Sequence, residues 1–116
     1  MNEPPSESLA LARLCRELVL EKKAEDVVVL DMRGISSFCD FFVICNGLSE
    51  PHLKAIAGNV DLRLKEMGRR ARGRDGAYSS HWLVIDYDDV IIHIFRADVR
   101  ARYGLERLWG DAKRVE

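Results

Sequence analysis

The segment from residue 82 to residue 95 constrains the fold of this chain more than any other part of it. Two apolar runs, 82–87 and 90–95, flank the short acidic turn Asp88-Asp89. Apolar, β-branched runs on either side of a two-residue turn are typical of a β-hairpin. We therefore expect two antiparallel strands in which Tyr87 lies opposite Val90.

A two-residue loop also gives the hairpin two different faces, because successive side chains of a strand point to opposite sides of the sheet. One face is almost wholly aliphatic and is expected to lie in the core; it contains Leu83, Ile85, Tyr87, Val90, Ile92 and Ile94. The other, which we call the mixed face, contains Trp82, Val84, Asp86, Ile91, His93 and Phe95. A register shift of one residue would exchange the two faces. Aromatic side chains beside an imidazole and a carboxylate favour a binding surface over a catalytic pocket.

The composition restricts the classes of protein to which the chain can belong. It has 116 residues and a formal net charge of −1, from 18 basic and 19 acidic side chains. This length suits one domain, and the balanced charge argues against a free-standing nucleic-acid-binding protein. No apolar stretch approaches the roughly 20 residues of a membrane span, and the first residues do not form a secretory signal. We therefore expect a cytoplasmic protein with no membrane partner.

The residue types that usually carry chemistry are scattered. Cys15, Cys39 and Cys45 are odd in number and widely spaced, which fits neither a disulfide framework nor a zinc site and indicates reduced thiols. No P-loop, zinc-protease or nucleophile-elbow motif occurs. The sequence therefore predicts no catalytic residue, no metal ligand, no cofactor and no small-molecule substrate.

The order of predicted elements indicates an α/β domain with a mixed sheet flanked by helices. Residues 1–7 read as a flexible tail, followed by one domain over 8–116. Ser49 is expected to cap the second helix, with Pro51 in its first turn and Gly68 at its end. The expected elements are a helix over 8–23, buried strands over 26–32 and 41–45, a helix over 49–67, a short edge strand within 69–78, the hairpin, and a last helix after Asp98 that Gly104 interrupts.

One enzyme hypothesis stays open on these patterns. Asp86 and Asp88 have the D-x-D spacing that can hold a divalent metal in nucleotide-transferring enzymes, and the Gly47-Leu48-Ser49 turn between a strand and a helix could contact a phosphate. Aspartates at a hairpin tip are, however, more often part of a solvated turn. A small protein that binds nucleotide and metal is therefore the alternative hypothesis.

Two further features admit a functional and a structural interpretation. Arg69, Arg70, Arg72 and Arg74 form the only dense basic run, which could contact RNA phosphates or be a solvated loop. Trp82 and Tyr103 are equally well explained as core residues and as interface anchors, because large aromatics dominate both settings.

Four blocks in the same order resemble the Iojap family, the ribosomal silencing factors. The resemblance covers nearly the whole chain after the tail. The blocks are Asp31-x-x-Gly34-x-Ser36-Ser37-x-x-Asp40-Phe41-Phe42-Val43-Ile44, Asn46-Gly47-Leu48-Ser49-x-x-His52-x-x-Ala55-Ile56-Ala57, Trp82-x-x-x-Asp86-Tyr87-x-Asp89-Val90-x-x-His93-x-Phe95 and Tyr103-x-Leu105-Glu106-x-Leu108-Trp109.

The resemblance implies a fold related to nucleotidyltransferases but without their catalytic carboxylates. It also implies a function in a bacterial cytoplasm: binding to the large ribosomal subunit at ribosomal protein fourteen, which sterically blocks the small subunit and reduces translation when nutrients are scarce. A homodimer in the free state and a minor contact with ribosomal RNA are further expectations. One departure is Asp88, where the family usually has Gly.

The mixed face and the resemblance together predict a partner-binding site. Trp82 and Tyr103 are the expected anchors, and Asp86 and Glu106 are expected to meet basic residues of the partner. The complete predicted set is Trp82, Asp86, His93, Phe95, Arg100, Tyr103 and Glu106.

Overall fold

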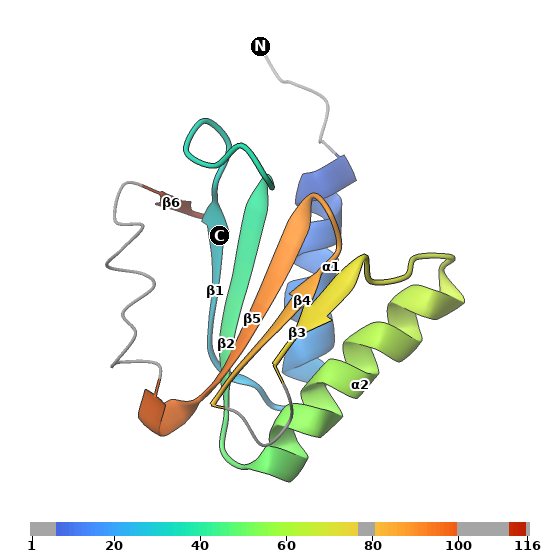
Figure 1. Ribbon diagram of the computed structural model, residues 1–116, viewed down its shortest axis with the longest axis vertical. Coiled ribbons are helices and arrows are strands. Elements are labelled where there is room, and N and C mark those ends of the chain that lie inside the picture. The colour runs from blue at the N-terminus through green and yellow to red at the C-terminus, as the bar shows by residue number, and fades with distance from the viewer. Residues whose placement is uncertain (1–6, 77–80, 100–111, 116) are drawn as a thin grey trace.

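The structure is a computed structural model that describes residues 7–76, 81–99 and 112–115 (Figure 1). It has two long helices and a six-stranded sheet, which confirms the predicted α/β class. The elements are α1 (Glu7–Glu21), β1 (Glu25–Asp31), β2 (Phe41–Gly47), α2 (Glu50–Glu66), β3 (Gly73–Asp75), β4 (Trp82–Asp86), β5 (Val90–Arg96) and β6 (Lys113–Arg114).

The sheet is mixed, as predicted, with the strand order β3-β4-β5-β2-β1-β6. Its central strands, β2 and β5, are parallel, and the other neighbouring strands are antiparallel. All seven residues of β2 are buried. A parallel pair requires a crossover connection, and the segment between β2 and β5, which includes α2, supplies it.

The hairpin of β4 and β5 has the predicted register. Trp82 pairs with Phe95 and Ile85 pairs with Ile92. The Tyr87 N–H donates to the carbonyl of Val90 at 2.9 Å, so the loop has two residues. Asp88 adopts a φ of 72°, the region in which Gly is favoured and Asp is among the better substitutes.

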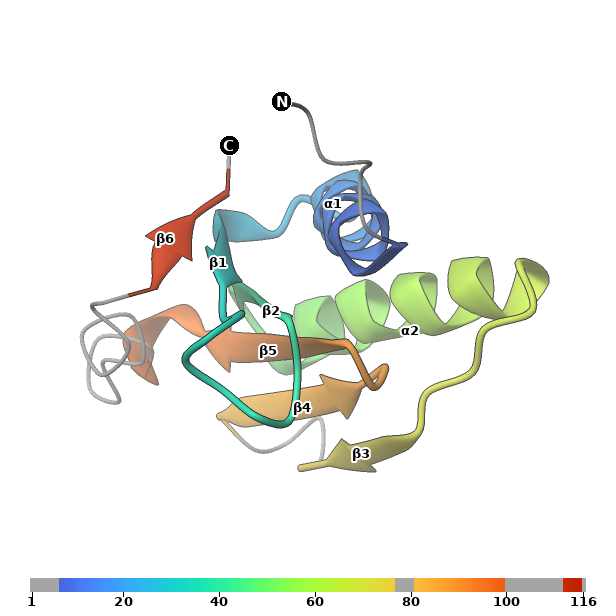
Figure 2. The same cartoon turned by 90° about the horizontal axis from the view of Figure 1, so that it is seen from above.

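Both helices cover the same side of the sheet (Figure 2). The buried stripes of α1 and α2 pack in one apolar cluster with the aliphatic hairpin face. Every residue predicted for that face is buried. The mixed face therefore lies on the side of the sheet opposite α1 and α2, where a second apolar cluster surrounds Phe42 and Phe95.

The start and end of α2 follow from local chemistry. The Ser49 hydroxyl accepts the His52 N–H at 3.2 Å, and Pro51 lies in the first turn, as predicted. Gly68, at a φ of 82°, turns the chain away from the helix axis. The predicted end of the helix at Met67 is one residue too late: the helix ends at Glu66, and Met67 is the C-cap and is 61% exposed.

Other boundaries differ by one or two residues, and one strand was not expected. Helix α1 ends at Glu21 rather than Lys23, because Lys23 has a φ of 60° and cannot continue it. The two-residue strand β6 was missed, since Lys113 and Arg114 carry no strand periodicity.

The predicted last helix lies mostly outside the described residues, as does the predicted tail except for Glu7, which belongs to α1. No helix in the described ranges is long and apolar enough to cross a membrane.

We predict opposite effects for two Gly→Ala substitutions. A Cβ on Gly47 would lie 2.7 Å from Cδ2 of Leu53, which is fully buried, so Gly47→Ala should lower the free energy of unfolding. The expected loss is about 1–3 kcal/mol, the usual cost of overpacking. Gly58 lies within α2 and has open space around it, so Gly58→Ala should raise the free energy of unfolding by about 0.5–1 kcal/mol. Urea unfolding measures both; equal changes would contradict the packing role of Gly47.

Candidate functional site

Trp82 is the central side chain of the mixed face. It is half-buried, and its indole stacks on Phe95 with ring centroids 5.1 Å apart and planes 21° apart. The indole Nε1–H donates to Nδ1 of His93 at 3.1 Å. A ring held both by stacking and by a hydrogen bond has little rotamer freedom left to lose when a partner binds.

His93 lies beneath Trp82 and is 6% exposed. Phe42 of β2 meets its ring edge-on at 4.5 Å. Burial lowers the pKa of the imidazole to about 4, so His93 is neutral at pH 7. Because Nδ1 accepts the hydrogen bond from the indole N–H, we assign the imidazole hydrogen to Nε2. Nε2 is buried and has no hydrogen-bond partner in the part of the chain that the structure describes.

Phe95 has no exposed surface, and His93 has almost none, so both support Trp82 from below. The half-buried side chains on this face are those of Val84, Asp86 and Ile91, together with Trp82 itself. Trp82 is thus the half-buried aromatic side chain of this face, and its choice as the anchor stays a prediction. Arg100, Tyr103 and Glu106 lie outside the described residues.

Asp86 and Asp88, the two aspartates of the D-x-D spacing, are engaged in structural contacts. One oxygen of Asp86 accepts the Asp88 N–H at 2.7 Å, and Asp88 forms an ion pair with Arg72 at 2.8 Å. Among the described residues there is no group of three or more histidine, cysteine, aspartate or glutamate side chains that could hold a metal ion. The two aspartates of the D-x-D spacing therefore stabilise the turn and connect it to Arg72.

The basic run divides into paired and unpaired members. Arg72 contacts Asp88, and Arg74 forms an ion pair with Asp61, which also accepts the Tyr87 hydroxyl. Within the described ranges, the side chains of Arg69 and Arg70 form no ion pair. Contact of Arg69 or Arg70 with a phosphate would therefore break no ion pair between the described residues.

Sequence reasoning missed two residues. Phe42 supports His93 because β2 and β5 are parallel neighbours, a long-range pairing with no local signal. Phe38, in the loop 33–40 between β1 and β2, is 80% exposed. A single Phe forms no periodic pattern from which its exposure could be predicted. The one signal that could have been used is its position in the loop between two predicted strands, next to Ser37 and Cys39.

Comparison with known proteins assigns the chain to a family. The family described as "Ribosomal silencing factor during starvation" matches residues 5–116. A ribosomal silencing factor of Halalkalibacterium halodurans is 45% identical over 106 residues, which cover 91% of each chain. This chain belongs to the ribosomal silencing factor family, a class of ribosome-associated regulators of translation.

Solved structures agree with this assignment. A crystal structure of a Bacillus halodurans protein superposes with a TM-score of 0.81 at 42% identity, covering 92% of this chain and 97% of the other. A Chromobacterium violaceum protein gives a TM-score of 0.84 at 31% identity, covering 90% and 88%. The arrangement of two helices on one side of a mixed sheet is therefore that of solved relatives.

The buried imidazole predicts a dependence of stability on pH. His93 has a pKa of about 4 in the folded chain, against 6.5 for an ordinary histidine, so the unfolded chain binds the proton first as pH falls. The free energy of unfolding should therefore decrease from pH 6.5 towards pH 4, by up to about 1.4 kcal/mol per pH unit from this group. In the His93→Gln variant, this contribution to the pH dependence of the free energy of unfolding should be absent. Urea unfolding at a series of pH values measures it. Parallel slopes, or an imidazole that titrates near 6.5 by NMR in the folded protein, would refute the assignment.

Proposed function

We propose that this chain binds the large ribosomal subunit at ribosomal protein fourteen and thereby prevents the small subunit from joining. Translation is reduced as a result when nutrients are scarce, and the setting is a bacterial cytoplasm. The family supplies the class of function. The observation that supports the choice of surface is Trp82, a half-buried indole fixed on Phe95 and His93 on the side of the sheet away from α1 and α2.

This function requires a binding surface and bulk rather than a reaction. Interfaces are centred on tryptophan, tyrosine and arginine anchors surrounded by groups that exclude water. Trp82 is such an anchor, with Val84 next to it on the same face and Ile91 further along the hairpin, opposite Asp86. The helical layer on the opposite side of the sheet supplies the bulk that would clash with an approaching small subunit.

Charge complementarity orients the complex in this proposal. Asp86 lies half-buried on the mixed face and meets basic side chains of the ribosomal protein, which affects the association rate more than the affinity. Arg69 and Arg70 make a minor contact with ribosomal RNA phosphates, because Arg72 and Arg74 are already paired within the chain. Arg100, Tyr103 and Glu106 complete the proposed site, and the free chain forms a homodimer.

Sedimentation with purified subunits tests the function. The chain should sediment with large subunits alone at physiological salt, and mixing both subunits with the chain should reduce the joined ribosomes. If the chain binds neither subunit even at low salt, where charged contacts are strongest, the proposal fails. A thermal shift with a nucleoside triphosphate and magnesium would then favour the nucleotide-binding hypothesis.

Replacement of the anchor should weaken binding strongly. We expect Trp82→Ala to reduce the free energy of binding to the large subunit by about 2 kcal/mol or more, the scale of an interface hot spot. Leu62→Ala is the matched control, because Leu62 is 58% exposed on α2 and lies away from the mixed face. Quantitative co-sedimentation measures the affinities, and circular dichroism verifies that both variants fold. Equal affinities for a folded Trp82→Ala and the wild type would remove Trp82 from the site.

A further inference from the structure

Phe38 is the most exposed of the large apolar side chains in the described ranges. It is 80% exposed, and Ile35 on the same loop is 40% exposed. Single exposed apolar residues are common on protein surfaces and need no special explanation. Phe38 differs from such residues because the loop that carries it, residues 33–40, is held in one conformation.

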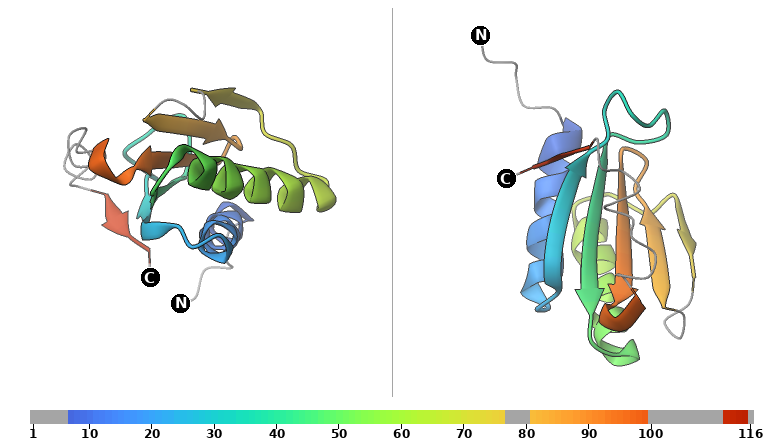
Figure 3. Two further views of the ribbon diagram at one scale, coloured as in Figure 1. Left: turned by 90° about the horizontal axis from the view of Figure 1, so that it is seen from below. Right: turned by 90° about the vertical axis from the view of Figure 1, so that its left-hand side faces the viewer.

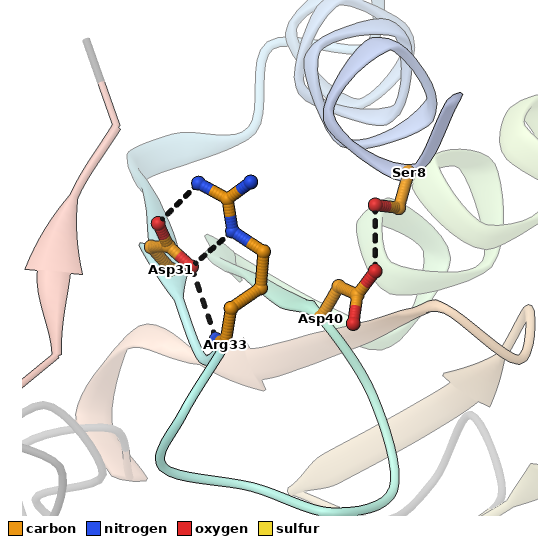
Figure 4. A network of polar contacts seen from close by, with 4 residues as sticks. All are labelled: Ser8, Asp31, Arg33 and Asp40. Atoms are coloured by element: carbon orange, nitrogen blue, oxygen red, sulfur yellow. Dashed lines mark hydrogen bonds and ion pairs between the residues drawn. The ribbon is translucent and has the colours of Figure 1, made fainter. Parts of the chain in front are cut away.

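Polar contacts fix both ends of the loop (Figure 4). At the β1 end, Asp31 accepts three hydrogen bonds from Arg33: from the backbone N–H at 3.0 Å, from Nε at 2.9 Å and from Nη2 at 2.7 Å. At the β2 end, the Ser8 hydroxyl of α1 donates to Asp40 at 2.7 Å. The Arg33 hydrogen bonds hold the pKa of Asp31 below its usual range, so the contact persists at neutral pH.

Hydrogen bonds within the loop hold the segment around Phe38. The Met32 N–H donates to the carbonyl of Asp40 at 2.7 Å and closes the base of the loop. Ile35 and Ser36 donate their N–H groups to the carbonyl of Met32, and the Phe38 N–H donates to the Ser36 hydroxyl at 3.1 Å. An exposed phenyl ring on a backbone ordered in this way loses less conformational entropy on binding than one on a free loop.

The loop adjoins the mixed face. Cys39 is buried in the same apolar cluster as Phe42 and Phe95, so the loop packs on the side of the sheet opposite α1 and α2. The Asp40 N–H donates to the carbonyl of Asp89 at 2.7 Å, which joins the loop to the hairpin turn. In Figures 2 and 3 the loop projects away from α1, towards the side of the sheet where the mixed face lies.

Two aspartates meet at this junction: the Asp40 carboxylate accepts the Ser8 hydroxyl of α1, and Asp89 is exposed in the turn. Burial is the main cause that raises the pKa of the Cys39 thiol, and the negative charges of Asp40, Asp86 and Asp89 raise it further. The Asp89 carboxylate forms no ion pair within the described ranges. A partner surface in which an apolar recess has a basic border complements the exposed Phe38 together with the exposed carboxylate of Asp89 in the adjoining turn.

We propose that Phe38 is a second anchor, which inserts into an apolar recess of a basic protein surface while Trp82 engages the same partner. The inference rests on the proposed function, since it takes the partner of the mixed face to be a ribosomal protein. The two anchors lie at opposite ends of the hairpin: the loop 33–40 contacts the turn through Asp40 and Asp89, and Trp82 pairs with Phe95 at the other end. The docking surface therefore extends beyond the hairpin to the end of the sheet where β1 meets β2.

Phe38→Ser tests the proposal against a matched control. Phe38 is exposed, so the substitution should leave folding intact, and Leu62→Ser removes an apolar side chain of similar exposure from α2. We expect Phe38→Ser to weaken binding to the large subunit about tenfold or more and Leu62→Ser to have no effect. Asp89→Asn should lower the association rate and its salt dependence. Co-sedimentation gives the affinities, and stopped-flow fluorescence with labelled chain gives the rates.

The outcomes separate this inference from the proposed function. If the wild type does not bind the large subunit, both fail. If the wild type binds and Trp82→Ala weakens it, but Phe38→Ser binds as tightly as the wild type, only the second anchor is refuted. If Phe38→Ser changes the mass of the free chain in sedimentation equilibrium and leaves ribosome binding unchanged, Phe38 contacts a second copy of the chain, which also overturns the inference. Equal losses in Phe38→Ser and Leu62→Ser would show a non-specific effect of exposed apolar surface.

Discussion

The parallel pairing of β2 with β5 joins the two halves of the chain, and the arrangement of the other elements depends on it. It aligns Phe41–Gly47 with Val90–Arg96 residue by residue in the buried centre of the sheet. A parallel pair cannot be closed by a tight turn, so α2 must cross over one side of the sheet and pack there with α1. The pairing therefore decides which side is covered by these helices and which side carries the mixed face.

The same pairing builds the support beneath Trp82. Phe42 reaches the edge of the His93 ring only because its strand lies beside β5, and His93 then accepts the indole hydrogen bond of Trp82. A buried neutral imidazole is an unusual choice for this position, since burial disfavours its charged form. It gives the half-buried indole a hydrogen-bond partner within the sheet.

A binding protein of this kind uses its charged residues for structure as well as for recognition. Arg72 and Arg74 tie the short edge strand β3 to the turn and to α2, through Asp88 and Asp61. Arg33 and Ser8 fix the ends of the loop that exposes Phe38. The exposed ion pairs among these contacts contribute little to global stability, typically about 0–1 kcal/mol each. Their role here is to restrict the positions of surface segments, which reduces the entropy lost on binding.

The sequence alone determined the features that depend on local chemistry: the hairpin register, the two faces of the hairpin, the Ser49 cap and the end of α2 at Gly68. Each follows from side-chain alternation or backbone preference over a few residues. The exposure of Met67 and Phe38, the strand β6 and the support of His93 by Phe42 were decided by the tertiary structure. These features depend on which distant segments meet, and contacts between segments far apart in sequence leave no periodic pattern from which they could be predicted.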